Sequence, residues 1–214
     1  LKDLKRDPEV ESALRMHEIL DYKSQLEKNH FAETPSRKRI MEKVMDRWLQ
    51  NKHMMLTGPT GTGKTEIFRE LMRKFWQEEL SETLISGSQT ITDYTLFGKP
   101  GGMKKTEGGM DVYFTPSGFT VGMGKGLPVI LDEFDLIDTN TRLRLKALYN
   151  FRPGDEYTVQ EDTSYKIKIK GGFCIGATAN LKSEKHKERF NLDPAENRVW
   201  EEERIDYLPE EELF

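Results

Sequence analysis

The feature that most constrains this chain is an eight-residue stretch in which three glycines lead into a lysine and a threonine: Gly58-Pro59-Thr60-Gly61-Thr62-Gly63-Lys64-Thr65. Glycine lets a backbone curl so tightly that several N–H groups face one point, and such a ring of donors binds phosphate. The stretch follows the apolar run Met54–Leu56 and precedes a helical pattern. The positive end of that helix would face the same point. The sequence therefore predicts a phosphate-binding loop between a strand and a helix.

Each part of this loop has an expected contact with a nucleoside triphosphate. We expect the backbone from Gly58 to Glu66 to bind the phosphates, with Lys64 reaching the β- and γ-phosphates. The hydroxyl of Thr65 is a predicted ligand of Mg²⁺. An ordinary glycine-rich turn is the alternative, but the flanking strand and helix favour phosphate binding.

A second stretch, Val129-Ile130-Leu131-Asp132-Glu133, places two carboxylates directly after an apolar strand. Ligands of parallel α/β sheets bind at the carboxyl ends of the strands, so we expect both acids near the glycine loop. Asp132 is a candidate magnesium ligand, directly or through water. Glu133 is a candidate for orienting and polarising an attacking water. A helix-capping aspartate followed by a solvated glutamate is the alternative for so common a string.

A third stretch, Ile175-Gly176-Ala177-Thr178-Ala179-Asn180, ends a predicted buried strand in an amide. We expect this strand to lie beside the strand that bears the acids. Asn180 can then contact the γ-phosphate or the attacking water. A turn residue at the end of a strand is the alternative.

The order of the predicted elements indicates an α/β protein with a parallel five-stranded sheet between two layers of helices, as in P-loop NTPases. Helical patterns are expected at about 35–50, from the glycine loop to about 79, and at about 139–149. Core strands are expected at 54–57, 84–86, 128–131, 173–177 and 204–207. Two inserted β-hairpins are expected, one from the runs 112–114 and 118–121, and one from 157–159 and 166–169.

The ends of the sequence suggest a domain boundary and a longer protein. Residues 1–33 are charge-rich with a loose helical pattern, and we predict a helical extension there, followed by a core domain at 34–214. The sequence begins with Leu1 rather than methionine, so we expect it to be a piece of a longer protein.

Composition excludes several classes of protein. Hydrophobic residues make up 36% of the chain, charged residues 33%, and the mean hydropathy is −0.71. No apolar run approaches the roughly 20 residues that span a bilayer, and we expect an intracellular, cytoplasmic protein. The net charge of −4 provides no overall attraction to nucleic acid. The single Cys174 excludes an intramolecular disulfide and a cysteine-cluster metal site.

Together these motifs resemble those of AAA+ ATPases. Gly58–Thr65 resembles Walker A, Val129–Glu133 resembles Walker B with its acid pair, and Asn180 resembles sensor 1. Three further segments resemble those of MoxR-like and dynein-related (midasin-type) members: Thr92–Gly98, the hairpin stretch Phe114–Gly118, and Tyr157–Lys170, which precedes sensor 1. The resemblance covers about residues 35–208.

This resemblance implies ATP and Mg²⁺ as ligands, ATP hydrolysis, and a hexameric ring that remodels or assembles a protein client. Asp193–Arg198 is similar to the family stretch whose arginine finger enters a neighbouring subunit's site, although its spacing is one residue shorter than in some relatives. Arg198 is therefore the predicted finger, and Arg189, which precedes Phe190, is its rival. The small helical lid that carries sensor 2 is expected outside this sequence.

Other functions stay open. The domain could be a nucleotide-gated binding module with little turnover, with residues 98–126 as the partner surface, or a phosphotransferase such as a P-loop kinase. A DNA-associated branch of the same clade uses GTP. The Asn-Lys-x-Asp pattern of ordinary GTPases is absent from the sequence, which favours adenine.

Overall fold

The computed structural model describes residues 31–77, 82–106, 109–160, 164–180 and 198–212; from 102 to 112 only the backbone is described. The chain divides into two units, residues 1–34 and 35–214. All elements below belong to the second unit. The helical extension expected in 1–33 lies almost wholly outside the described residues and stays a prediction.

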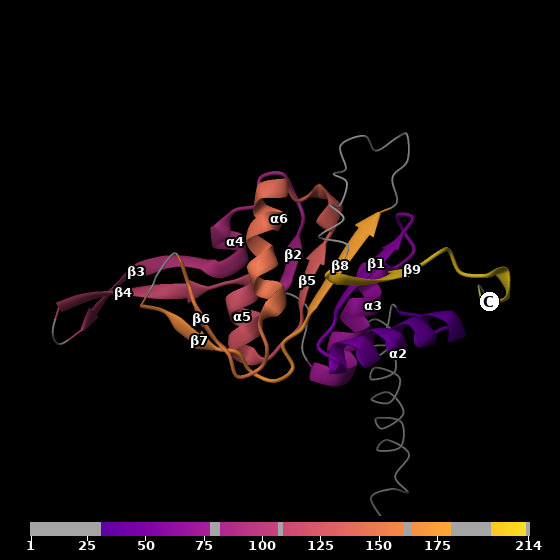
Figure 1. Cartoon of the computed structure of the whole chain (residues 1–214), viewed down its shortest axis with the longest axis horizontal. Coiled ribbons are helices and arrows are strands. Elements are labelled where there is room, and N and C mark those ends of the chain that lie inside the picture. Colours follow the sequence, from indigo (N-terminus) through magenta and orange to yellow (C-terminus); the bar gives the residue numbers. More distant parts are fainter. Residues whose placement is uncertain (1–30, 78–81, 107–108, 161–163, 181–197, 213–214) are drawn as a thin grey trace, which may run out of the picture. The chain divides into compact units, whose positions relative to one another are not determined.

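The core is one parallel sheet of five strands (Figure 1). The strand order is β2-β5-β8-β1-β9, and every neighbouring pair is parallel. The strands are β1 (His53–Gly58), β2 (Leu84–Ser86), β5 (Val129–Asp132), β8 (Ile175–Asn180) and β9 (Trp200–Arg204). The predicted α/β fold, with a parallel five-stranded sheet and inserted hairpins, is therefore confirmed.

One face of the sheet is covered by α2 (Pro35–Leu49) and α3 (Lys64–Leu71), which continues as a π-helical turn (Met72–Trp76). Successive strand residues point to opposite faces. Gly176 faces this layer, because a Cβ there would lie 2.8 Å from the ring of Phe68. Trp48 of α2 stacks on Phe68 at 5.6 Å and donates from its indole N–H to the carbonyl of Ile175 at 3.1 Å.

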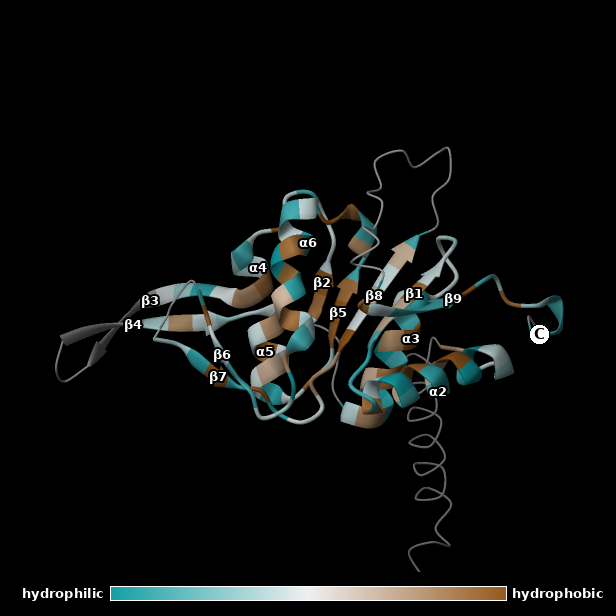
Figure 2. Ribbon diagram, in the orientation of Figure 1, coloured by the Kyte–Doolittle hydropathy of each residue, from teal (hydrophilic) through white to brown (hydrophobic). Residues whose placement is uncertain are grey.

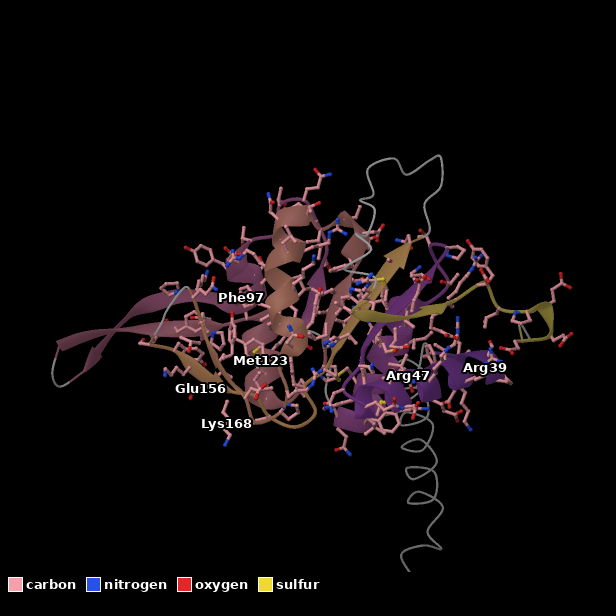
Figure 3. The ribbon with its side chains drawn as sticks, viewed as in Figure 1. Arg39, Arg47, Phe97, Met123, Glu156 and Lys168 are labelled. Atoms are coloured by element: carbon pink, nitrogen blue, oxygen red, sulfur yellow. The ribbon has the colours of Figure 1, made fainter. Side chains whose placement is uncertain are left out.

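The opposite face packs against α5 (Gly118–Lys125), α6 (Thr139–Leu145) and the following 3₁₀ helix (Lys146–Asn150). Val129, Leu131, Ile175 and Ala177 alternate with the residues of the first face and join one core cluster. Phe97 and Met123 contribute to the same cluster (Figure 3). Figure 2 shows hydrophobic residues along the inner strands.

Two hairpins extend from this layer. A short helix, α4 (Asp93–Phe97), leads into β3 (Gly98–Thr106), which pairs with β4 (Gly109–Pro116) from Gly98↔Pro116 to Thr106↔Gly109, with a shift between Pro100 and Met103. The second hairpin pairs β6 (Glu156–Thr158) with β7 (Lys166–Lys168). The ring of Phe114 packs on Tyr165 at 4.5 Å, joining the two hairpins.

The prediction of a β-run at Gly118–Val121 is wrong, because these residues form the first turn of α5. Ser117 precedes the helix, and its backbone N–H donates to the hydroxyl of Thr120 at 2.9 Å. This is half of a capping box, in which a side chain three residues into a helix binds the capping residue. The partner of β4 is instead β3.

Two predicted boundaries also need correction. The strand expected at 204–207 lies at Trp200–Arg204, where it pairs with β1 at the edge of the sheet. Its run of three glutamates is unfavourable for a strand, but Trp200 is 7% exposed and anchors it in the core. The helix after the glycine loop ends at Trp76, before Gln77, whose φ of 55° is left-handed.

Two further short 3₁₀ helices in the described part of this unit are Phe134–Leu136 and Glu210–Glu212. The carboxylate of Glu212 accepts from the backbone N–H of Ser36 at 3.2 Å and from its hydroxyl at 2.5 Å. The C-terminal segment thereby binds the first turn of α2. Within the described ranges, no helix combines the length and the apolar character needed to cross a bilayer.

Candidate active site

The glycine loop joins the end of β1 to the start of α3. Its φ angles are 153° at Gly58, 84° at Gly61 and 84° at Gly63, which side-chain-bearing residues rarely adopt. A Cβ on Gly58 would lie only 1.9 Å from the carbonyl oxygen of Ile205. The loop thus has a curled backbone directly before a helix N-terminus, the arrangement that binds phosphate.

Lys64 turns back over this loop. Its side chain is buried, and Nζ donates to the carbonyl oxygens of Gly58 at 3.0 Å and Pro59 at 2.7 Å. A third bond, of 2.8 Å, reaches Oδ1 of Asn180 at the end of β8. The fold therefore places two predicted site residues, 116 positions apart in the chain, in direct contact.

Thr65 and Asp132 also meet. The Thr65 hydroxyl donates to Oδ1 of Asp132 at 2.7 Å. No group of three or more His, Cys, Asp or Glu side chains in the described part of the chain could hold a metal by itself. Mg²⁺ is commonly held by one or two protein oxygens together with substrate phosphates and water. The hydroxyl and carboxylate beside the phosphate loop therefore fit Mg²⁺ bound together with a nucleotide.

Glu133 follows Asp132 and has a left-handed backbone, with φ 51° and ψ 46°. Such a conformation costs roughly 1–2 kcal/mol for a residue with a Cβ, so surrounding contacts must hold it. It ends β5 abruptly and begins the 3₁₀ turn Phe134–Leu136. Glu133 lines the same pocket as Lys64 and Thr65.

Asn180 contacts two other parts of the chain, the 3₁₀ turn after β5 and the glycine loop. Its backbone N–H donates to Oδ1 of Asp135 at 3.3 Å, and Asp135 is 4% exposed. The hydroxyl of Thr60 lies 3.5 Å from Oδ1 of Asn180. The amide at the end of β8 therefore faces the glycine loop.

These residues surround one pocket of about 230 Å³ at the carboxyl ends of β1, β5 and β8. Its lining contains most of the predicted site, namely Thr60, Gly61, Gly63, Lys64, Thr65, Glu66, Asp132, Glu133 and Asn180, together with Thr178. Three residues of the predicted loop belong to its backbone curve but do not line this pocket: Gly58, Pro59 and Thr62. Lys64 is the one lysine or arginine among these lining residues.

Sequence reasoning missed Thr178 and Asp135 as parts of this site. Thr178 precedes Asn180 by two residues, so strand periodicity places both side chains on one face. That signal could have identified it. Asp135 had no comparable signal, because its contact with β8 depends on the turn after Glu133.

Arg198 lies away from this pocket. It is exposed and precedes β9, whose first residue, Trp200, pairs with His53, the first residue of β1. The pocket lies at the other ends of these strands. Five residues of β9 at about 3.3 Å each separate the two edges by roughly 15 Å. Arg198 therefore does not serve the pocket of its own chain; the rival Arg189 lies outside the described residues.

A second pocket, of about 180 Å³, lies beside the glycine loop between the start of α2 and the segment after β9. The hydroxyl of Tyr207 in that segment donates to the carbonyl of Thr60 at 3.2 Å. The pocket mixes apolar and polar lining residues, including Ser36, Arg37, Ile40, Thr62, Ile205 and Leu208. The sequence had not indicated it.

Comparisons with known proteins identify a family and a fold for this chain. The family model described as AAA domain (dynein-related subfamily) matches residues 53–195. A crystal structure of NtrX from Brucella abortus in complex with ATP superposes with a TM-score of 0.51 at 15% identity, covering 92% of this chain and 44% of that one. Another NtrX crystal structure from the same organism has a TM-score of 0.49 at 18% identity, over 91% of this chain and 42% of its own.

The chain thus spans less than half of the NtrX chains, and at this identity the likeness concerns the fold alone. Among curated protein sequences, none matches this chain.

Proposed function

The chain belongs to the AAA domain family, in its dynein-related subfamily, and on this basis we propose that it binds ATP with Mg²⁺ and transfers the γ-phosphoryl group to water. The observation that carries the proposal is the meeting of Lys64, Thr65, Asp132, Glu133 and Asn180 around one pocket. These residues come from three separate stretches of sequence. Each bears a group that phosphoryl transfer requires.

The roles follow from the contacts. The loop amides and Lys64 bind phosphate, while Thr65 and Asp132 are the side chains that would hold Mg²⁺. That ion would neutralise charge on the phosphates during transfer. Glu133 is the carboxylate that would orient and polarise the attacking water, and Asn180 would contact the γ-phosphate or that water.

We place the nucleotide base in the second pocket, which shares the glycine loop with the first. ATP is favoured over GTP by the family and by the lack of an Asn-Lys-x-Asp pattern in the sequence. The fold neighbour NtrX has been crystallised with ATP, which is a property of that protein. Competition of ATP and GTP for a fluorescent nucleotide tests this choice, and stronger displacement by GTP would contradict it.

We also propose that copies of the domain assemble in a ring in which Arg198 of one subunit completes the site of the next. Two observations support this arrangement. Among the described residues, no arginine lines the pocket. The pocket lies at the carboxyl ends of the strands, whereas Arg198 precedes the amino end of β9. Remodelling or assembly of a macromolecular client is the expected work of such a ring.

Two substitutions in the full-length protein test the reaction. Lys64→Ala removes the cation that contacts the phosphates and should abolish ATP binding. Glu133→Gln should leave ATP binding intact and reduce phosphate release by about 10²- to 10⁴-fold, the range for loss of a general base. Calorimetry measures binding, and a coupled phosphate assay measures turnover.

The exposed Lys38 offers a matched control, since Lys38→Ala should change neither quantity. Unaltered turnover in the Glu133→Gln variant would contradict the assigned role. Tight ATP binding without phosphate release by the assembled wild type would favour the alternative, a nucleotide-gated binding module.

A further inference from the structure

The hydroxyl of Thr178 lies between the two acidic residues of the site. Thr178 is 1% exposed. Its Oγ1 donates to Oδ1 of Asp132 at 2.5 Å and accepts from the backbone N–H of Glu133 at 2.9 Å. A hydroxyl has one donor and two acceptor positions, so one group can serve both neighbours at once.

The bond to Glu133 restrains the peptide between Asp132 and Glu133. The N–H of that peptide is held by Thr178, and its carbonyl, Asp132 O, accepts from the N–H of Gly87 at 2.6 Å. Gly87 approaches so closely that a Cβ there would lie 2.2 Å from the carbonyl oxygen of Glu133. The peptide plane is therefore fixed from β8 on one side and from the end of β2 on the other.

This restraint acts on a residue, Glu133, that has an unfavourable left-handed backbone conformation. Glu133 has φ 51° in a chain segment whose next residues form a 3₁₀ turn, closed by Leu136 N–H donating to Glu133 O at 2.9 Å. Left-handed residues with side chains persist only where several contacts hold them. The direction of the Glu133 side chain follows from that backbone conformation.

The bond to Asp132 restrains the other carboxylate. Oδ1 of Asp132 accepts from two hydroxyls, Thr65 at 2.7 Å and Thr178 at 2.5 Å. Two donors on one oxygen limit rotation of the carboxylate. Thr178 thus links the predicted metal ligand to the predicted water-activating residue.

We propose that Thr178 is a positioning residue that holds Asp132 and Glu133 in their relative geometry for ATP hydrolysis. This inference rests on the proposed function. Thr178 acts through the two acids and donates no proton to the reaction. Its removal should therefore reduce turnover far more than nucleotide affinity.

Thr178→Val and Thr178→Ser in the full-length protein separate the effect of the Thr178 hydroxyl from the effect of the side chain's shape. Valine keeps the branched side chain and removes the hydroxyl, and we expect kcat to fall about 10- to 100-fold, as for residues that orient metal ligands. Affinity for a non-hydrolysable ATP analogue should change by less than about threefold. Serine restores the hydroxyl and should recover most of the turnover. Thr158→Val, on the exposed face of β6, is the matched control and should behave as wild type.

Hydrogen exchange gives a readout that does not depend on catalysis. The Glu133 amide is protected by Thr178, so the peptide 131–134 should exchange faster in Thr178→Val than in the nucleotide-free wild type, and Thr178→Ser should restore protection. If the valine variant does not fold, the serine and alanine variants provide the same comparison.

Wild-type turnover in Thr178→Val, unchanged exchange at 131–134, or a serine variant as impaired as the valine variant would each overturn the inference. Absence of phosphate release from the assembled wild type would instead contradict the proposed hydrolysis. The exchange measurement would then decide the positioning role alone.

Discussion

At the scale of single residues, Lys64 and Asn180 have the most informative contact. The ammonium of Lys64 donates to Oδ1 of Asn180 and to two loop carbonyls. A phosphate that binds the loop must compete with these acceptors for Lys64. Asn180 therefore has two opposed effects on binding, since it would also contact a γ-phosphate.

These effects separate when ADP is compared with ATP. In Asn180→Ala, ADP should bind more tightly than to wild type, because Lys64 loses a competing acceptor and ADP has no γ-phosphate to lose a contact. A hydrogen bond to a charged group is worth about 1.5–3 kcal/mol, so an increase of about tenfold is expected. Preference for ATP over ADP should decrease.

Calorimetric titration with both nucleotides measures this preference, and Asn150→Ala, an exposed asparagine outside the pocket, is the control. Weaker ADP binding to Asn180→Ala would show that the bond to Lys64 does not compete with phosphate.

At the scale of elements, β1 has different chemistry at its two ends. Its last residue, Gly58, opens the phosphate loop, and its first, His53, is buried against Tyr149 and Trp200. Nε2 of His53 lies 2.7 Å from the carbonyl of Tyr149, which requires the proton on that nitrogen. Nδ1 has no hydrogen-bond partner among the described residues. Burial lowers the pKa of His53, the Tyr149 carbonyl opposes this, and the charge of Arg152 lowers it further.

The lowered pKa makes stability depend on pH. Unfolded His53 takes up a proton near pH 6.5, whereas folded His53, whose pKa is lowered, takes it up only at lower pH, so the free energy of unfolding should fall as pH decreases from 7 to 5. The slope from this group is at most about 1.4 kcal/mol per pH unit. His53→Phe keeps an aromatic ring and cannot be protonated, so its stability should decrease less over this range.

Urea unfolding of both proteins at several pH values measures the difference between the two curves. Parallel curves between pH 7 and 5 would contradict a buried, neutral His53. The Tyr149 carbonyl keeps a second donor in the variant, Arg152 Nη1 at 3.3 Å.

At the scale of the whole molecule, the sheet separates the pocket from Arg198. The parallel strands carry the loop, the acids and Asn180 at their carboxyl ends, while Arg198 precedes the amino end of β9. A chain built this way has the candidate nucleotide pocket at the carboxyl ends of its strands and Arg198 near the amino end of β9. Head-to-tail contacts between copies would bring the two together.

Mixing two inactive variants tests this arrangement. Arg198→Ala should reduce turnover by about 10³-fold or more, as for arginine fingers in general, while ATP affinity stays near that of wild type. Mixed with Glu133→Gln, it should regain part of the turnover, because some interfaces then combine an intact Glu133 with an intact Arg198.

Phosphate release by each variant alone and by equimolar mixtures of the full-length proteins measures this recovery. Arg189→Ala is the comparison variant. If turnover recovers when Arg189→Ala is mixed with Glu133→Gln, and Arg198→Ala alone is fully active, the finger is Arg189.

Much of the site could be predicted because its signals are local. The glycines of the loop are required by left-handed φ values, and the acid pair follows an apolar run that ends at the sheet edge. The reliance on local patterns also explains the wrong predictions of secondary structure. Gly118–Val121 has the composition of a strand, but a capping contact between Ser117 and Thr120 makes it a helix. The acidic β9 has weak strand propensity and is held by pairing with β1.

Local sequence patterns were sufficient to predict the α/β class, the glycine loop, the acid pair and the amide, because glycine conformations and a two-residue period act over a few neighbouring residues. Three relations required the folded chain: Thr178 joins Asp132 to Glu133, Lys64 bonds Asn180, and Arg198 lies at the opposite ends of the strands from its own pocket. These relations depend on which strands become neighbours and in what register. The bonded groups are 45 to 116 residues apart, so no local pattern could specify them.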